Sequence, residues 1–377
     1  MNTGIYIHVP FCKSKCPYCD FYSEVGKKPE YLPALIKEIE MFRSKSGDME
    51  TVDTVYFGGG TPSILEPDET GLILDSLKNK FHFQDPEITI EVNPKTVDFE
   101  KLSCYREQGI NRLSIGAQSF DDSVLKKLGR VHKSTDNEDV FYLARQAGFS
   151  NISIDLMFGI EGQTQEVWID TVKRAIGLMP EHISLYSLEF MPGTKFSKWL
   201  EEGRMKETDT ETDRKMYHKA LELTREAGYI QYEISNVSMP YHQSRHNMKY
   251  WNLDEYIGFG PSASSYYGGK RTTNFAGLDK YAAYIGKGLS PAGEIVFNEP
   301  DDDMSEYTFT KLRTNEGLEY YEFQNRFGVR FWEHFGIDTE KEFIKYSQTG
   351  HTVLTDDGIR LTETGFDISN KILCLFV

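Results

Sequence analysis

Short apolar runs alternate with longer amphipathic stretches through the first 236 residues of this chain. The runs are rich in β-branched residues, and the stretches between them repeat their apolar residues at helical spacing. Because a crossover helix returns the chain to the same end of a sheet, repeated strand–helix units predict an α/β fold with a parallel sheet. Six units are fewer than the eight of a closed TIM barrel, so we expect a partial (β/α)6 barrel that is open on one side or closed by another element. The predicted strands are residues 5–9, 54–57, 88–92, 112–115, 152–157 and 183–188, and the predicted helices are residues 31–42, 69–77, 99–108, 140–147 and 167–178.

Unusual polar and glycine-rich residues follow these strands. The first strand leads into residues 12–19, the second into residues 58–62, and the third ends near Glu91. The fourth runs into Gln118, and the fifth carries Asp155. In barrels of this kind the chemistry collects at the C-terminal ends of the strands, so we expect these residues to line one cavity.

Three of the five cysteines, Cys12, Cys16 and Cys19, stand in a CxxxCxxC spacing on the loop after the first strand. A [4Fe–4S] cluster normally takes four thiolates, one for each iron, so three thiolates without a fourth leave one iron free for a small molecule. A zinc site built from these cysteines and His8 is the alternative, although structural zinc loops usually bring cysteines in two separated pairs. Three cysteines at this spacing cannot all pair, which disfavours a disulfide.

The charge and hydropathy of the chain exclude several classes of protein. A net charge of −16 over 377 residues argues against a nucleic-acid or anionic membrane surface, because no basic run in the sequence offsets it. No apolar run approaches the roughly 20 residues that span a bilayer, and the first residues lack the pattern of a signal peptide. With so few cysteines, the sequence predicts a cytoplasmic protein with at most peripheral membrane contact.

The character of the sequence changes after residue 236. Residues 237–300 are rich in Tyr, Gly, Ser and Asn and poor in helical periodicity, which predicts an extended segment of strands and loops. Residues 301–377 turn helical again, at 304–312, 318–327 and 339–346, and then show two β runs joined by Asp-Asp-Gly, a hairpin signal. We therefore expect three parts: a barrel at 1–236, the extended segment, and a small α+β C-terminal domain with a winged-helix-like tail. The acidic composition favours packing or protein contact over DNA binding for that tail.

Each polar residue at a strand end has a structural and a functional interpretation. Residues 58–62 (GGGTP) form either a tight turn or a backbone surface that approaches a ligand closely. Buried carboxylates such as Glu91 and Asp155 need partners, which could be Arg112 or Arg130 in an ion pair, or a ligand. Arg130 has the guanidinium that binds a carboxylate through two parallel hydrogen bonds.

Four phrases of the sequence resemble one known family. They are residues 6–12 (YIHVPFC), 56–63 (YFGGGTPS), 116–120 (GAQSF) and 154–159 (IDLMFG). The cysteine spacing, with Tyr18 before the third cysteine, resembles the radical S-adenosylmethionine (radical SAM) superfamily. The order of all four phrases resembles the family of oxygen-independent coproporphyrinogen III dehydrogenase and its relatives, over nearly the whole chain.

This resemblance implies a set of site residues. It implies that Cys12, Cys16 and Cys19 hold a [4Fe–4S] cluster. It implies that S-adenosylmethionine is contacted by Tyr6, Gly59, Gly60, Thr61, Glu91, Gln118, Arg130 and Asp155, with Arg130 on the methionyl carboxylate and the others on the ribose and amino groups.

Within that family the chain looks like the haem-chaperone branch. The dehydrogenase carries a further cysteine where this chain has Phe21, and a long N-terminal extension where only eleven residues precede Cys12. Residues 246–251 (HNMKYW) resemble the HNxxYW motif of the chaperone branch, in which the histidine is implicated in haem binding. Imidazole is a usual ligand of haem iron, whereas the structural alternative is that His246 only makes a hydrogen bond inside a loop.

Three hypotheses about function follow. The first is a binding protein, a cytoplasmic haem chaperone with a [4Fe–4S] cluster and S-adenosylmethionine that passes haem to an acceptor protein, as a monomer or weak dimer. The second is an enzyme that oxidatively decarboxylates coproporphyrinogen III by radical chemistry of its cofactor. The third is a structural protein stabilised by zinc.

Overall fold

A single twelve-stranded sheet organises the computed structural model, which describes residues 2–377. Its order is β14-β13-β12-β11-β1-β4-β5-β6-β7-β8-β10-β9, and the strands from β11 to β8 run parallel to their neighbours. All six predicted strands are present within the parallel part. The sheet is therefore the expected partial barrel with one further parallel strand, β11, and antiparallel strands at both edges. The bounds are β1 Thr3–Val9, β4 Thr51–Gly59, β5 His82–Val92, β6 Arg112–Gln118, β7 Ile152–Phe158, β8 His182–Ser187, β9 Ile230–Glu233, β10 Asn236–Ser238, β11 Tyr256–Phe259, β12 Ser264–Tyr266, β13 Lys270–Asn274 and β14 Ala292–Phe297.

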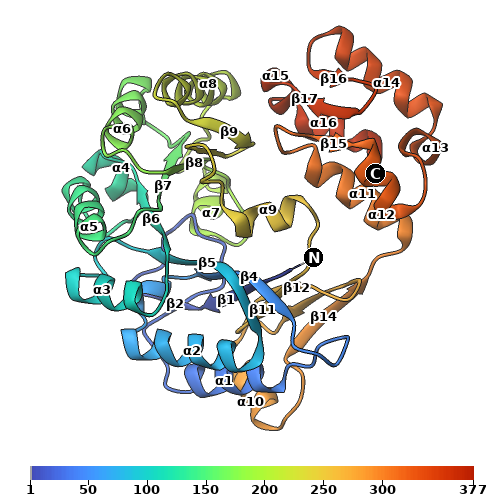
Figure 1. Cartoon of the computed structure of the whole chain (residues 1–377). Helices are drawn as coiled ribbons and strands as arrows, with labels where there is room; N and C mark the ends of the chain where they lie inside the picture. Colours follow the sequence, from blue (N-terminus) through green and yellow to red (C-terminus); the bar gives the residue numbers. More distant parts are fainter. Residues whose placement is uncertain (1) are drawn as a thin grey trace.

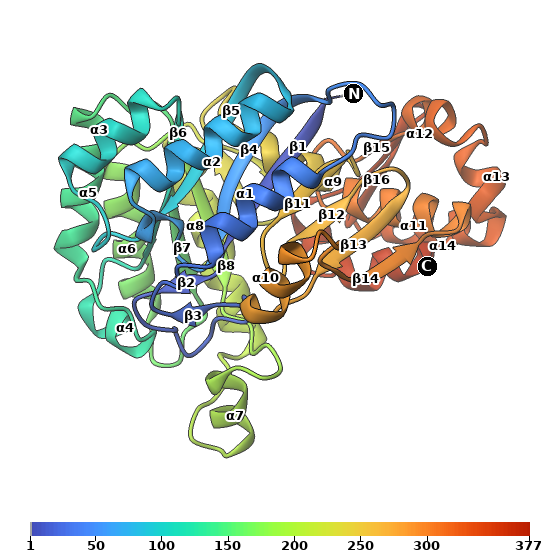
Figure 2. The same ribbon diagram turned by 90° about the horizontal axis from the view of Figure 1, so that it is seen from below.

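Helices cover the outer side of the curved sheet (Figure 1). Several begin at residues whose side chains accept a hydrogen bond from the first turn, such as Asp98, Thr164 and Asp209, as good N-caps do. A further helix, α7, projects from the rest of the barrel (Figure 2). The bounds are α1 Tyr31–Met41, α2 Pro67–Lys80, α3 Phe99–Glu107, α4 Asp122–Lys127, α5 Ser134–Gln146, α6 Gln165–Gly177, α7 Lys195–Glu201 and α8 Thr210–Glu226.

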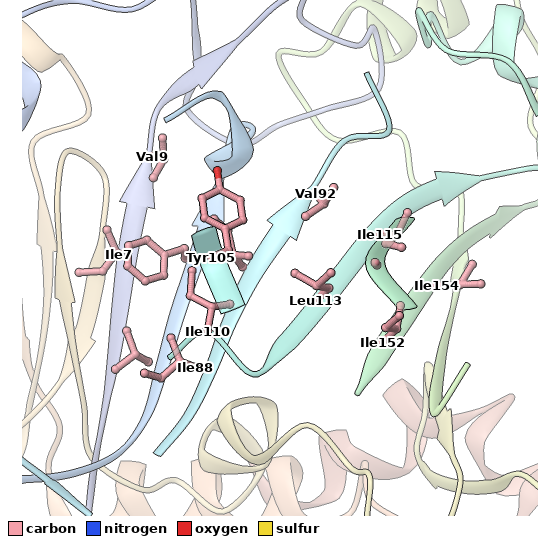
Figure 3. Close-up of a cluster of buried hydrophobic side chains, with 14 of the residues drawn as sticks. Ile7, Val9, Ile88, Val92, Tyr105, Ile110, Leu113, Ile115, Ile152 and Ile154 are labelled. Atoms are coloured by element: carbon pink, nitrogen blue, oxygen red, sulfur yellow. The ribbon is translucent and has the colours of Figure 1, made fainter. Parts of the chain in front are cut away.

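The two faces of the parallel strands have opposite chemistry. Residues such as Ile7, Ile88 and Ile154 point outward and pack under the helices, where they form the main hydrophobic core (Figure 3). Their sequence neighbours belong to the inner face because side chains alternate along a strand. That inner face is polar: it includes Tyr6, His8, Thr54, Tyr56, Glu87, Glu91, Arg112, Ser114, Ser153, Asp155, His182 and Ser184. A polar inner face is the setting for a ligand cavity.

Residues 237–300 continue the main sheet. The strands β11 to β14 confirm the expected extended character, but the absence of helical periodicity was misleading, since the segment contains α9 (Arg245–Trp251) and α10 (Leu278–Gly286). Both helices are short, and α9 owes its start to Ser244, whose hydroxyl accepts from the Asn247 amide at 3.3 Å. The expected HNxxYW loop is thus a helix, and it lies over the open inner side of the sheet (Figure 1).

The C-terminal residues form a second core around Phe323, Phe331 and Phe343. Tyr256 and Tyr266 of the main sheet belong to the same core. The predicted hairpin is confirmed as β16 and β17, which form a three-stranded sheet with β15. The elements are α11 Pro300–Lys311, β15 Leu318–Glu319, α12 Tyr320–Phe327, α13 Phe331–Phe335, α14 Ile337–Gln348, β16 Thr352–Leu354, β17 Gly358–Leu361, α15 Glu363–Phe366, α16 Ser369–Leu373 and the 3-10 turn Cys374–Phe376.

Hydropathy of the helices bears on membrane insertion. Among residues 2–377, none of the helices combines the length and the apolar composition required to cross a bilayer.

Candidate functional site

Two cavities, both lined in part by the loop 12–23, lie on the inner side of the sheet; the first is at the C-terminal ends of the parallel strands, and the second reaches from there to His246 beside Thr54 of β4. The first, here called the cysteine-loop pocket, is lined by residues of the loop 12–23 together with Gly60, Thr61, Asn93 and Arg130. The second, here called the tyrosine cavity, has a volume of about 470 Å³ and is lined by Tyr6, Tyr22, Tyr56, Tyr186, Tyr250 and Tyr256, with His8, Glu91 and His246 among them. Loop 12–23 and the glycines after β4 contribute to both cavities.

The cysteine loop is fixed at its base by a short parallel pair, β2 (Phe11–Cys12) with β3 (Glu24–Val25). The amide of Glu24 donates to the carbonyl of Pro10 at 2.7 Å. On the outer side, the amide of Phe196 at the start of α7 donates to the carbonyl of Pro17 at 3.0 Å. The loop is therefore held from both sides, and its three thiols face one pocket.

The thiols of Cys12, Cys16 and Cys19 are free, and all three line the cysteine-loop pocket. No three His, Cys, Asp or Glu side chains of residues 2–377 converge tightly enough to hold a single metal ion. A [4Fe–4S] cluster instead takes each thiolate on a different iron. The donor set therefore fits the cluster in type and number, and the other two cysteines, Cys104 and Cys374, do not line this pocket.

The glycines after β4 pack the loop against β1. An added Cβ at Gly60 would lie 2.7 Å from the carbonyl oxygen of Phe11, and one at Gly59 would lie 2.6 Å from the His8 ring. The amides of Gly60 and Thr61 donate to the carbonyls of Val9 and Phe11 at 2.8 and 2.7 Å. These amides are therefore occupied, and what this segment can offer a ligand is carbonyl oxygen and the Thr61 hydroxyl, which lies 3.6 Å from the Cys12 sulfur.

Arg130 reaches the cysteine loop from the end of α4. Its Nη2 donates to the carbonyl of Gly116 at 2.7 Å, and its Nη1 lies 3.8 Å from the Cys16 sulfur. Its Nε is buried and has no partner in the described structure. Next to it, Gln118 has a φ of +65°, a backbone conformation that is rare outside glycine and tends to occur at functional sites. A guanidinium with an unused buried donor is suited to an anionic ligand group.

Glu91 of β5 lies beside the rings of Tyr6 and Tyr56, which come from β1 and β4. It accepts a hydrogen bond of 3.0 Å from the Tyr56 hydroxyl. Burial, and secondarily the nearby Asp155, raises the pKa of Glu91 to about 8. Tyr6 stacks on Tyr56 with ring centroids 6.3 Å apart, and its hydroxyl lies 3.1 Å from Nδ1 of His8.

Asp155 is engaged by three serine hydroxyls. Ser114 donates to it at 2.9 Å, Ser184 at 2.8 Å and Ser153 at 3.2 Å. Burial raises the pKa of Asp155, and these hydrogen bonds oppose that shift. Asp155 and Gln118 are both partly exposed, and neither is among the residues that line the two cavities.

His246 is buried, with 1% of its surface exposed, on the side of the tyrosine cavity opposite the cysteine loop. Its Nδ1 lies 2.9 Å from the Thr54 hydroxyl and its Nε2 lies 2.8 Å from the Tyr250 hydroxyl. The ring stacks on Tyr56 with centroids 5.3 Å apart. Burial, with a smaller contribution from Lys249, lowers the pKa of His246 to about 3, so the ring is neutral at ordinary pH.

Sequence reasoning missed four of the tyrosines in the cavity: Tyr22, Tyr56, Tyr186 and Tyr256. The alternation of side chains along the strands could have predicted two of them. Tyr56 lies opposite Tyr6 on the neighbouring strand, and Tyr186 follows the inward-facing Ser184 by two residues on β8. Tyr22 and Tyr256 come from a loop and from a strand that the sequence did not predict.

Profile matches divide the chain into two regions. Residues 6–175 match the Radical SAM superfamily, and residues 298–368 match the HemN C-terminal domain.

Curated relatives match most of the chain. The protein "Heme chaperone HemW" of Bacillus subtilis is 36% identical over 86% of this chain and 86% of its own length. The protein of the same name from Lactococcus lactis is 31% identical over 99% of this chain and 96% of its own length.

Among solved structures, the coproporphyrinogen III oxidase HemN of Escherichia coli superimposes with a TM-score of 0.86. The match covers 100% of this chain and 90% of the other, at 23% identity. It establishes the fold.

Proposed function

The chain belongs to the HemW family of the radical SAM superfamily, and on this basis we propose that it is a haem chaperone that binds haem beside a [4Fe–4S] cluster and passes it to an acceptor protein. Its haem site is the tyrosine cavity, with His246 in its wall. The acceptor is a protein that takes up haem, the chaperone acts in the cytoplasm, and it is a monomer or a weak dimer.

The observation that carries this proposal is the juxtaposition of the two cavities. The tyrosine cavity offers several flat aromatic faces and a volume of about 470 Å³, within the range of cavities that hold small molecules and cofactors. It adjoins the pocket of Cys12, Cys16 and Cys19 through the same loop. A planar, largely apolar ligand in this cavity would lie next to the cluster.

Residues of the rim would hold the cofactors. Cys12, Cys16 and Cys19 bind the cluster, and when bound, the cluster and S-adenosylmethionine supply one-electron chemistry. Arg130 binds the methionyl carboxylate of S-adenosylmethionine, for which its unused Nε is available. The same ligand is contacted by Tyr6, Gly59, Gly60, Thr61, Glu91, Gln118 and Asp155.

The experiment is an anaerobic titration of the full-length protein with haem, before and after reconstitution with iron and sulfide. We expect a saturable Soret band at one haem per chain, and an affinity at least tenfold lower in His246→Ala. His82→Ala is the matched control, because His82 is exposed at the N-terminal end of β5 and does not line the tyrosine cavity.

Two results would contradict the proposal. One is a Soret band that does not saturate in either state of the protein. The other is conversion of coproporphyrinogen III to protoporphyrinogen IX in the presence of S-adenosylmethionine and a reductant, which would make the chain a dehydrogenase.

A further inference from the structure

The position of His246 leaves no free nitrogen for an iron atom. Nδ1 is engaged by the Thr54 hydroxyl at 2.9 Å, and Nε2 by the Tyr250 hydroxyl at 2.8 Å. The histidine is 1% exposed, whereas Tyr250 is partly exposed and lines the tyrosine cavity with it. The Tyr250 hydroxyl is thus the group in the cavity wall that contacts Nε2 of the imidazole.

Resting on the haem-binding function proposed above, we propose that Tyr250 coordinates the ferric iron of haem and that His246 is a positioning residue that acts through the Tyr250 oxygen. Tyrosine is an established axial ligand of haem iron. The assignment of Tyr250 as the ligand rests on its hydrogen bond to His246.

The coordination step balances without a change of oxidation state. The O–H bond of Tyr250 breaks, a bond forms between its oxygen and Fe(III), and the proton leaves to water through the open cavity. In the haem-bound state we place the single ring proton of neutral His246 on Nε2, where it is donated to the phenolate oxygen, while Nδ1 accepts from the Thr54 hydroxyl. A hydrogen bond to a charged oxygen is stronger than one between neutral groups, so this donor stabilises the bound phenolate.

The surroundings keep the histidine neutral and the tyrosine in place. Lys249 and Arg112 face His246 and disfavour a second positive charge there. Burial, and after it the neighbouring Tyr256, Tyr6 and Glu91, raise the pKa of Tyr250, so the phenolate forms only when the iron replaces the proton. The Tyr250 ring packs edge-on against Tyr256, with centroids 4.7 Å apart, and against His246 at 5.2 Å. Since Tyr256 belongs to the core of the C-terminal domain, the ring has a rigid support.

The test compares four full-length proteins titrated with ferric haem: the wild type, Tyr250→Phe, His246→Gln and Tyr142→Phe. Tyr142 is exposed on α5 and lines neither cavity, so Tyr142→Phe is the matched control. We expect the wild type and the control to show the phenolate-to-iron charge-transfer band and the phenolate modes in resonance Raman spectra.

Tyr250→Phe should lose both signatures and bind haem at least tenfold more weakly. His246→Gln retains a side chain that can donate to the Tyr250 oxygen, so it should keep the phenolate signature at lower affinity. Circular dichroism and thermal melting of each variant without haem establish that it is folded.

The inference is overturned if Tyr250→Phe keeps the wild-type spectrum, whether His246→Gln changes it or not. A histidine-ligated spectrum in the wild type overturns it as well. These results leave haem binding itself intact, whereas a wild type that binds no haem sinks the proposed function instead.

Discussion

The Tyr56 hydroxyl donates a hydrogen bond of 3.0 Å to Oε1 of Glu91, across neighbouring parallel strands of the inner face. This bond holds a partly buried carboxyl in the wall of the tyrosine cavity. Burial raises the pKa of the Glu91 carboxyl to about 8.

Replacing Glu91 with Gln should weaken binding of S-adenosylmethionine about tenfold, because the amide cannot ionise beside the cationic amino group of the ligand, and a hydrogen bond to a charged group is worth roughly 1.5 to 3 kcal/mol. Equilibrium dialysis of labelled S-adenosylmethionine against cluster-loaded protein measures the change. Glu294→Gln, at an exposed position of β14, is the control. Equal affinity in Glu91→Gln and the control would remove Glu91 from the site.

Replacing any one of Cys12, Cys16 and Cys19 with Ser should remove most of the iron and acid-labile sulfide after anaerobic reconstitution. Serine is a poor ligand for the irons of the cluster, which are held by thiolates. Cys104→Ser should keep the full content, since Cys104 lies on α3 away from the pocket. Iron and sulfide assays and the visible spectrum decide the outcome. Equal loss in Cys104→Ser, or a single zinc atom in the wild type, would contradict the cluster assignment.

Substitution of Gly60 by Ala should lower the free energy of unfolding by on the order of 2 kcal/mol. The new Cβ would lie 2.7 Å from the Phe11 carbonyl oxygen and 2.9 Å from that of Val9, so the cysteine loop must shift. Gly177→Ala is the matched control, because nothing lies within 4 Å of the added Cβ at the end of α6, and it should be neutral or stabilising. Urea unfolding of both variants measures the difference. A Gly60→Ala protein as stable as the wild type would show that the loop yields at no cost.

The stability of the chain should decrease with rising pH because of Glu38. Its carboxyl accepts hydrogen bonds from Tyr281, Asn274 and the Gly260 amide at 2.5, 2.7 and 2.8 Å, yet burial raises its pKa from 4.5 to about 7. The folded state therefore holds a proton that the unfolded state releases between those two values. The stabilisation is complete below pH 4.5 and is lost as the pH rises through about 7.

Glu38→Gln removes this dependence. Between pH 5 and 8, the wild type should lose on the order of 3 kcal/mol relative to the variant, since each pH unit of the interval corresponds to about 1.4 kcal/mol. Urea unfolding at several pH values provides the measurement. Parallel pH profiles for the two proteins would place the titrating group elsewhere.

Much of the barrel could be predicted because its strands and helices carry their own periodicity. Ile88, Ile90 and Val92 mark β5, and a hairpin signal marks β16 and β17. The rim residues Glu91 and Arg130 were found because glycine and charge interrupt apolar runs. Each of these signals lies within one short stretch of the chain, so it can be read from the sequence without knowing which distant residues are in contact.

The remaining features depend on contacts between distant residues. The seven residues of α9 show no helical periodicity. The position of this helix is set by contacts such as those of His246 with Thr54 and of Lys249 with Asp53. Likewise, β11 is a four-residue strand whose partner, β1, is some 250 residues earlier in the chain. The tyrosine cavity is assembled partly from these non-local pieces. Of its wall, Tyr6, Gly59, Glu91 and His246 were predicted as ligand contacts, whereas Tyr22, Tyr56, Tyr186 and Tyr256 were not.

The pairing of β1 with β4 on one side and β11 on the other has a consequence for biosynthesis. During translation, one edge of β1, the strand before the cysteine loop, has no hydrogen-bonded neighbour until residues 256–259 emerge from the ribosome. The tyrosine cavity is incomplete before that moment, because Tyr250 and Tyr256 arrive with the same segment. A nascent chain that ends before this segment therefore lacks one side of the cavity, even though its cysteine loop has already been made.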